Sequence, residues 1–320
     1  MNKLHRLLAW SLTLIFTLSV PSYGWGKLGH MAVAFVAYQK LNQTTRDRID
    51  TLLRINKEYD VWVSEMPKDA SDDDKKMMAF MIAATWPDRL RSKKLHPEID
   101  DDGEQPRTLE EGKRNTGYDD LLMHKYWHFI DKPFSPDNTP LEDPPDLNAK
   151  TRIDLFRKVL GSSEPDPKKS YDLVWLLHLV GDVHQPLHCT SRFTKLKSQK
   201  HGDRGGNLVK ICASAKCNTN LHSFWDDALG NNPNVTAAIK VGNRLPKARV
   251  EAAQNMDADK WVVDSFTDAK KTAYMNPPIG VSTKGLPITQ KYRDAVGSMC
   301  EKRVALAGAR LANILNKELR

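Results

Sequence analysis

The sequence predicts an all-α fold, a single domain of many helices with at most one small β-hairpin. Three observations support this. Apolar residues recur at helical spacing near both ends of the chain. A long apolar stretch over residues 170–183 reads as a helix. Strand-like alternation occurs only briefly, at Val209 and Ile211.

The first 24 residues are typical of a secretory signal peptide that is cut after Gly24. A basic start is followed by apolar residues 7–20 and by small residues at positions 22 and 24. A membrane anchor is the alternative, but a spanning helix needs about 20 apolar residues. We therefore expect a secreted protein, periplasmic or extracellular, with one domain over residues 25–320 and no stable membrane insertion.

The charge balance and the cysteines narrow the class of protein. The net charge is +8, and loss of the leader with its two basic residues leaves +6. This surplus suits a polyanionic substrate without indicating one.

Four cysteines fit an exported protein: Cys189, Cys212, Cys217 and Cys300. Three pairings are open, and the local pair Cys212–Cys217 is favoured. No Cys-x-x-Cys spacing supports zinc binding by thiolates.

The first half of the mature chain contains three predicted helical segments and two loops. Ala34, Tyr38 and Leu41 lie at helical spacing, and residues 44–47 resemble a cap that begins a helix toward Leu53. Residues 77–84 form an apolar run. Residues 95–120 are polar and acidic, and residues 133–147 contain five prolines, so both segments are expected to be surface loops.

The second half contains the most informative run, a helix over residues 170–183 that is followed closely by Pro186. Proline disfavours helix at the residue before it, so the helix must break here. A hairpin is expected over residues 207–217 and a helix over residues 223–229. The last helix is indicated by a one-sided apolar pattern, formed by Val304, Ala307, Leu311, Ile314 and Leu315.

Two His-x-x-x-Asp pairs suggest a metal centre. His178 with Asp182 and His222 with Asp226 each place an imidazole and a carboxylate on one helix face. His188 follows Asp182 by roughly 600° of helix turn, so it can approach the same place only because Pro186 breaks the helix. Imidazole and carboxylate are zinc ligands, and a site with several metals indicates hydrolysis of a phosphate ester.

The alternative for a single pair is structural. A histidine on an apolar helix is usually a satisfied core residue. The second pair makes that interpretation less probable here, and a buried Asp182 without a cation would be costly.

Further motifs extend this pattern over nearly the whole mature chain. In order they are Trp25-Gly26 with Gly29-His30, Trp86-Pro87-Asp88, Trp127-His128-Phe129-Ile130-Asp131, the run from His178 to His188, Gly202-Asp203-Arg204-Gly205-Gly206-Asn207, and Asn220-Leu221-His222-Ser223-Phe224-Trp225-Asp226. Each motif is weak alone, but the ordered set strongly resembles the secreted single-strand-specific zinc nucleases of fungi and the plant bifunctional nucleases. These share a superfamily with the bacterial zinc-dependent phospholipases C.

The resemblance implies three zinc ions. One would be held by Asp88, His128, His178 and Asp182. A neighbour would be held by His30, Asp182 and the free amine and carbonyl of Trp25, so that Asp182 bridges the pair. The third would be held by His188, His222 and Asp226. The backbone nitrogen of Trp25 can bind zinc only as a free N-terminal amine, because an amide nitrogen has no lone pair to give. Cleavage after Gly24 would therefore complete the site.

The family pattern also implies residues that touch the substrate. Phe129 would stack on a base and Asp131 would hydrogen-bond its edge, which favours unstacked, single-stranded substrates. Arg91 would steady the phosphate. The alternatives are core packing for Phe129, a solvated charge for Arg91 and a simple helix cap for Asp88. His124 and His184 lie beside ligands and are expected at the surface or behind the ligands. His201 is expected to be exposed.

The expected activity is hydrolysis of single-stranded DNA and RNA to 5′-nucleotides by a zinc-activated hydroxide, with Asp182 and Arg91 in catalytic roles. Removal of 3′-phosphates from nucleotides is compatible with the same site. A phospholipase C with the same zinc ions, acting on phospholipid, is the rival enzyme. A non-catalytic zinc-scavenging protein is the rival from another class. No obligate protein partner is implied.

Overall fold

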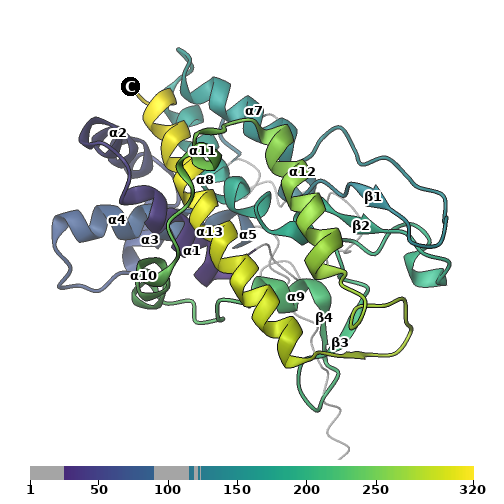
Figure 1. The fold of residues 1–320 in the computed structure, drawn as a ribbon. Coiled ribbons are helices and arrows are strands. Elements are labelled where there is room, and N and C mark those ends of the chain that lie inside the picture. The colour runs from purple at the N-terminus through teal and green to yellow at the C-terminus, as the bar shows by residue number, and fades with distance from the viewer. Residues whose placement is uncertain (1–24, 90–114, 119–121, 123) are drawn as a thin grey trace, which may run out of the picture.

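Three helices form the centre of the fold. The computed structural model describes residues 25–89, 115–118, 122 and 124–320. Within these, α1 (Lys27–Tyr38), α8 (Asp166–Asp182) and α13 (Gln290–Glu318) pack against one another. Figure 1 shows α13 in yellow, running diagonally from the C-terminus at the upper left to the lower centre of the view. The prediction of an all-α fold is confirmed.

The contact between α1 and α13 depends on a glycine. A Cβ at Gly308 would lie 2.6 Å from Cβ of Val36 and 2.8 Å from the carbonyl oxygen of Val33. Real Cβ atoms do not approach other atoms so closely, so only glycine lets the two helix backbones lie this near each other. The predicted apolar face of α13, from Val304 to Leu315, is buried as expected.

The helices around this centre include the predicted segments, with shifted bounds, and several that the sequence did not predict. α2 (Gln43–Arg54) begins one residue before the predicted cap, because the side chain of Asn42 accepts the hydrogen bond from the backbone N–H of Thr45. The other helices are α3 (Tyr59–Ser64), α4 (Asp72–Ala83), α5 (Trp86–Arg89), α7 (Ala149–Leu160), α9 (Leu221–Asp226), α10 (Val235–Arg244), α11 (Val250–Gln254) and α12 (Ala258–Asp268).

The helix α8 starts four residues earlier than predicted, at Asp166, and its residues from Lys169 to Asp182 are all buried. Proline in its first turn suits a helix start, where backbone N–H groups lack partners. The helix ends at Asp182, and a 3₁₀ turn, η2 (Pro186–Cys189), follows. The predicted break before Pro186 is therefore confirmed. Further short turns are η1 (Lys125–His128), η3 (Lys197–Gln199) and the π turn η4 (Ala269–Ala273).

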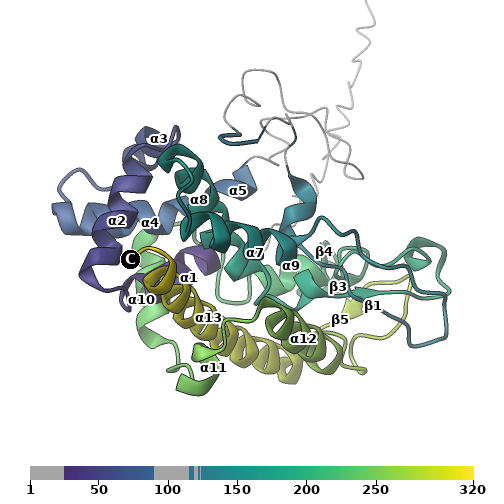
Figure 2. The same cartoon turned by 90° about the horizontal axis from the view of Figure 1, so that it is seen from above.

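Two small sheets lie at one end of the molecule, opposite α2, α3 and α4 (Figure 2). β1 (Pro133–Phe134) pairs in parallel with β2 (Ser191–Arg192). β3 (Lys210–Cys212) pairs with β4 (Thr219–Asn220) in antiparallel and with β5 (Leu286–Pro287) in parallel. The predicted hairpin is thus present, but its second strand lies beyond position 217.

The favoured disulfide is confirmed. Cys212 and Cys217 are joined, while Cys189 and Cys300 are buried free thiols. Most of the loop predicted over residues 95–120 lies outside the described residues. In the described part, Asn115 is buried and Tyr118 packs against the core. Among the described residues, none of the helices is long and apolar enough to span a bilayer.

Candidate metal centre

The C-terminal half of α8 presents the first ligand pair. His178 and Asp182 are fully buried and one helical turn apart, with His178 Nε2 3.2 Å from Asp182 Oδ2. Since Asp182 is the last residue of the helix, its carboxylate lies where other elements can approach it.

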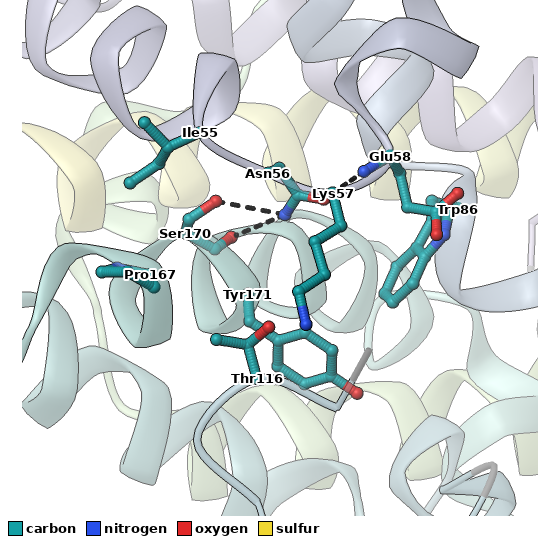
Figure 3. A pocket seen from close by; sticks show the side chains of 9 residues that line it. All are labelled: Ile55, Asn56, Lys57, Glu58, Trp86, Thr116, Pro167, Ser170 and Tyr171. Atoms are coloured by element: carbon teal, nitrogen blue, oxygen red, sulfur yellow. Dashed lines mark hydrogen bonds between the residues drawn. The ribbon is translucent and has the colours of Figure 1, made fainter. Parts of the chain in front are cut away.

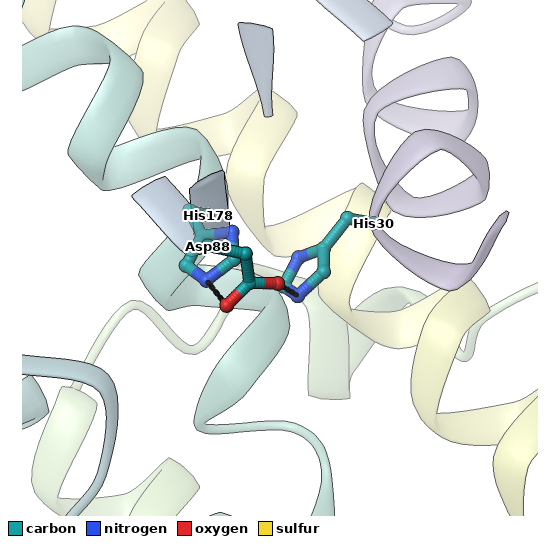
Figure 4. Close-up of side chains that lie close together, drawn as sticks. All are labelled: His30, Asp88 and His178. Atoms are coloured by element: carbon teal, nitrogen blue, oxygen red, sulfur yellow. Dashed lines mark ion pairs between the residues drawn. The ribbon is translucent and has the colours of Figure 1, made fainter. Parts of the chain in front are cut away.

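Three further elements converge on this pair. His128 comes from η1, and its Nδ1 lies 3.2 Å from Asp182 Oδ2. His30 comes from α1, with Nε2 3.4 Å from Asp182 Oδ1. Asp88 of α5 lies between His30 and His178, 4.0 and 3.5 Å from their Nε2 atoms (Figure 4). We call these five residues the close cluster.

The close cluster has the features of a cation site. Nδ1 of His178 donates to the carbonyl of Ala84 at 2.8 Å, so its Nε2 must present a lone pair in the neutral tautomer. That lone pair faces Nδ1 of His128 at 3.0 Å. Among the described residues, buried Nε2 of His30 and Oδ1 of Asp182 have no hydrogen-bond partner. Buried polar atoms in this state are costly unless a cation binds them.

The electrostatics agree with this interpretation. Burial acts to lower the pKa of His178, but the carboxylates of Asp182 and Asp88 outweigh it and raise the pKa to about 10. Burial acts to raise the pKa of Asp182, but His178 and His188 hold it well below its ordinary value. Positive charge is thus strongly favoured at the centre of this cluster, and a divalent metal ion would supply it in place of protons.

A second group of ligands lies beside the first. Nε2 of His188 and Nε2 of His222 are 3.1 Å apart, and Asp226 Oδ2 is 3.6 Å from His222. Nδ1 of His188 donates to the carbonyl of His128, and Nδ1 of His222 donates to the carbonyl of Gly205, each at 2.7 Å. These bonds leave both Nε2 lone pairs directed at one point, as in metal sites. We call His188, His222 and Asp226 the third-ion group, after the ion that the sequence resemblance assigns to them.

The backbone around Gly205 makes one of these bonds feasible. Its φ is +60°, and a Cβ there would lie 2.3 Å from the carbonyl oxygen of Leu187. Glycine is therefore required for the loop to pass between η2 and His222.

Three sets of side chains, two of them overlapping, could accordingly hold metal ions, since the candidate ligand atoms within each set lie within 4.8 Å of one another. Two of the sets share His178 and divide the close cluster between them. The sets are His30 with Asp88 and His178, His128 with His178 and Asp182, and the third-ion group.

Trp25 lies beside both groups. Its side chain is buried, and a Cβ at Gly181 would meet the Trp25 ring at 3.6 Å and His30 Nδ1 at 2.8 Å. The next residue, Gly26, donates its backbone N–H to the carbonyl of Asp226 at 3.1 Å. Trp25 thus packs near Gly181, the residue before Asp182, and is followed in the chain by a residue that bonds the backbone of Asp226.

The predicted base-binding residues are half-buried next to this centre. Phe129 follows His128, and its ring meets Tyr126 at 5.9 Å edge to face. The pKa of Asp131 is raised to about 8 by burial, with a further contribution from the charge of Asp203. A carboxyl in this state can donate as well as accept a hydrogen bond. Arg91 lies outside the described residues.

Of the two positions expected for His124 and His184, at the surface or behind the ligands, the surface is excluded because both side chains are buried. His124 stacks on Trp127 at 3.6 Å between ring centroids. Nε2 of His184 lies 2.9 Å from Arg310, and burial together with the charges of Arg303 and Arg310 lowers the pKa of His184 well below its ordinary value. His201 is exposed, as predicted, and pairs with Glu142.

The comparison with known families bears on the whole chain. The S1/P1 Nuclease family matches residues 25–320, which include every element of the centre. The chain belongs to the S1/P1 nuclease family.

Curated relatives of this S1/P1 family member align at low identity. Nuclease S1 of Aspergillus oryzae is 25% identical over 64% of this chain and 54% of its own length. Endonuclease 3 of Arabidopsis thaliana is 29% identical over 45% of this chain and 50% of its own length. For these relatives the chain spans about half of their length. Endonuclease 2 of Arabidopsis thaliana is 23% identical over 92% of this chain and 90% of its own length.

One residue of this S1/P1 family member was missed by sequence reasoning. Gln185 donates from Nε2 to Asp226 Oδ1 at 2.7 Å and accepts from the backbone N–H of Leu187 at 2.6 Å. It therefore orients a ligand of the third-ion group. Its position between His184 and Pro186 was visible in the sequence, but nothing there shows which distant carboxylate a glutamine reaches.

A small cavity beside Trp86 takes no part in the centre of this S1/P1 family member. Lys57, Ser170 and Tyr171 are among the residues that line it (Figure 3). Its volume is about 50 Å³. That is room for one or two water molecules and far too little for a nucleotide.

Proposed function

We propose that this protein is a secreted zinc-dependent nuclease that hydrolyses single-stranded DNA and RNA to 5′-nucleotides. The observation that carries the proposal is the convergence of the close cluster and the third-ion group on one buried centre in a chain of the S1/P1 nuclease family. Several metal ions at such short spacing are typical of phosphodiester hydrolysis.

The donors favour zinc and a count of three. Neutral imidazole and carboxylate in a closed, buried arrangement suit zinc better than the all-oxygen sites of magnesium or calcium. In the proposal, Asp88, His128, His178 and Asp182 hold one ion. His30, Asp182 and the terminal amine and carbonyl of Trp25 hold its neighbour. The third-ion group holds the last.

The chain's own groups have distinct roles in the proposed reaction. When bound, the zinc ions activate water at neutral pH and offset the charge that develops on the phosphate. Asp182 keeps the ligands of the close pair in register, because its two oxygens face different imidazoles. Arg91 steadies the phosphate, Phe129 stacks on a base and Asp131 bonds its edge. A base inside a duplex cannot enter such a slot, which explains a preference for single strands.

Secretion and metal binding are linked in this proposal. Cleavage after Gly24 frees the amine of Trp25, and an amide nitrogen at the same place has no lone pair to give. We expect that mature protein carrying one added N-terminal residue loses about one zinc equivalent and most of its activity. Elemental mass spectrometry, which gives the zinc content per chain, and an activity assay would show both losses. An extended protein with full zinc and full activity would contradict it.

The substrate is tested on protein that begins at Trp25. Single-stranded DNA, duplex DNA, RNA and phosphatidylcholine are compared with and without a zinc chelator. Chelator-sensitive release of 5′-nucleotides, faster from single strands and with lipid untouched, is expected. Lipid cleavage without nucleic-acid cleavage would overturn the substrate and favour a phospholipase C. Zinc binding without any hydrolysis would indicate a scavenging protein. Release of inorganic phosphate from a 3′-nucleotide would show that the protein also has 3′-nucleotidase activity.

A further inference from the structure

A short turn connects the two parts of the metal centre. Asp182 of the close cluster ends α8, and His188 of the third-ion group follows six residues later in η2. Between them, Gln185 bonds Asp226, the carboxylate of the third-ion group. We call residues 183–188 the linking turn. Its backbone conformation sets the distance between the two sets of ligands.

Two buried residues hold the backbone of this turn. Arg303 of α13 donates from Nε to the carbonyl of His184 at 3.0 Å. Ser265 of α12 donates from Oγ to the carbonyl of Val183 at 2.5 Å. Arg303 also contacts Ser265 Oγ, so both bonds belong to one network. Asp268 lies 3.7 Å from the guanidinium and partly balances its charge.

A second arginine holds the side chain of His184, which belongs to the turn. Arg310 lies two helical turns further along α13. Its Nη1 is 2.9 Å from Nε2 of His184. Its Nε donates to the carbonyl of Ala252 at 3.0 Å, and its guanidinium lies 5.3 Å from the ring centroid of Trp261. Nδ1 of His184 in turn donates to the carbonyl of Val180 within α8. His184 is thus fixed at both ring nitrogens.

Stability alone does not account for this arrangement. Burying two guanidinium groups is costly, and apolar side chains of similar volume would join α8, α12 and α13 at no such cost. The arginines instead make charge-assisted bonds to specific atoms, the carbonyl oxygen and Nε2 of His184. These atoms follow the end of a helix, where carbonyl groups lack partners within the helix. The atoms they hold belong to the segment that spaces Asp182 from His188.

We propose that Arg303 and Arg310 are positioning residues, which fix the linking turn and so set the third-ion group relative to the close cluster. This inference rests on the proposed function, because it assumes that both groups bind zinc. Loss of a group that only orients metal ligands typically costs about 10- to 100-fold in affinity or activity. The ion held by His188, His222 and Asp226 should be the one affected.

The test compares Arg303→Met with Arg157→Met. Arg157 of α7 makes similar contacts to residues outside the turn, a bond from Nη1 to the carbonyl of Met256 at 2.7 Å and an ion pair with Glu318 at 3.3 Å. Zinc equivalents and affinities are measured by chelator competition, together with cobalt absorption spectra and kcat and KM. Arg303→Met should weaken one of the three equivalents about 10- to 100-fold and lower kcat with little change in KM. Arg157→Met should keep all three at wild-type affinity.

Two further variants keep the test decisive. Arg303→Lys retains a donor for the carbonyl of His184, so it should recover part of the lost affinity. Ser265→Ala removes the bond to Val183 with a minimal change in volume, and it decides the matter if Arg303→Met does not fold. Wild-type zinc affinities and cobalt spectra in Arg303→Met, or in Ser265→Ala where the former does not fold, would overturn the inference. A wild-type protein without zinc would instead overturn the proposed function, and this inference with it.

Discussion

At the scale of single residues, Asp182 is the group with the central position in the proposed metal centre. Its carboxylate lies 3.2–3.6 Å from ring nitrogens of His30, His128, His178 and His188, which come from four different elements. Asp88, by comparison, lies 3.5–4.0 Å from ring nitrogens of His30, His128 and His178. Removal of the Asp182 carboxylate should therefore affect both ions of the close pair.

We expect Asp182→Asn to lose about two zinc equivalents and to lower hydrolysis of single-stranded DNA by more than about a hundredfold. Changes to groups that merely orient a ligand already cost about 10- to 100-fold. Asp172→Asn is the matched control, since Asp172 is a buried carboxyl on the same helix that bonds Tyr118 and faces no ligand. Near-normal zinc content and activity in Asp182→Asn would refute the assigned role.

Asp172 carries a prediction of its own. Burial raises its pKa to about 7, although the bond from Tyr118 partly opposes the shift. The unfolded chain has a pKa of about 3.9, so between these values the folded state binds more protons than the unfolded state. The free energy of unfolding contributed by Asp172 therefore falls as pH rises through this window.

Relative to Asp172→Asn, the wild-type protein should lose roughly 4 kcal/mol of unfolding free energy between pH 4 and pH 8. Denaturant unfolding of both proteins across this range measures the difference and cancels the contributions of other groups. Parallel curves for the two proteins would show that Asp172 does not carry the shift.

At the same scale, the sequence predicted which side chains converge better than it predicted their surroundings. His178 with Asp182 and His222 with Asp226 are local pairs, and helical spacing alone places each on one face. Trp25, His30, Asp88 and His128 have no such local partner, so only the resemblance indicated them. The burial of His184 and its contact with Arg310 join positions more than a hundred residues apart, which no local pattern encodes.

At the scale of elements, close packing of α1 against its neighbours positions His30. A Cβ at Gly308 would meet Val36 at 2.6 Å, whereas a Cβ at Gly297, earlier on the same helix, would meet no atom within 4 Å. The same substitution, glycine to alanine, is therefore expected to change stability in opposite directions at these two positions of α13.

Gly297→Ala should stabilise the protein by up to about 1 kcal/mol, because alanine is the better helix former. Gly308→Ala should destabilise it by about 1–3 kcal/mol through overpacking. It should also weaken zinc binding, since α1 carries His30 and would have to shift. Thermal unfolding and chelator competition measure both effects. Equal stability of the two variants would mean that α1 and α13 do not approach as closely as described.

Helices could be predicted at this scale and strands only in part. Amphipathic spacing and Pro186 were sufficient to predict the C-terminal half of α13 and the end of α8, but not the start of α13 at Gln290. The hairpin of β3 with β4 is local and was also predicted. The parallel pairs β1–β2 and β3–β5 join segments more than 50 residues apart, and their strands are too short to leave a pattern.

At the scale of the whole molecule, the proposed centre joins segments from Trp25 to Asp226, so metal binding would be coupled to folding. Removal of the proposed zinc ions would leave buried carboxylates and imidazoles without a cation. We expect a chelator to lower the midpoint of thermal unfolding by roughly 10 °C or more, because binding of this kind contributes several kcal/mol. An unchanged midpoint after complete removal of metal would contradict the coupling.

The most direct test follows zinc content and hydrolysis of single-stranded DNA together, in one preparation that begins at Trp25, as a chelator removes the metal and zinc is then restored. The proposed function predicts about three zinc ions per chain, loss of hydrolysis as they leave, and recovery when they return. Undiminished hydrolysis by metal-free protein would contradict it.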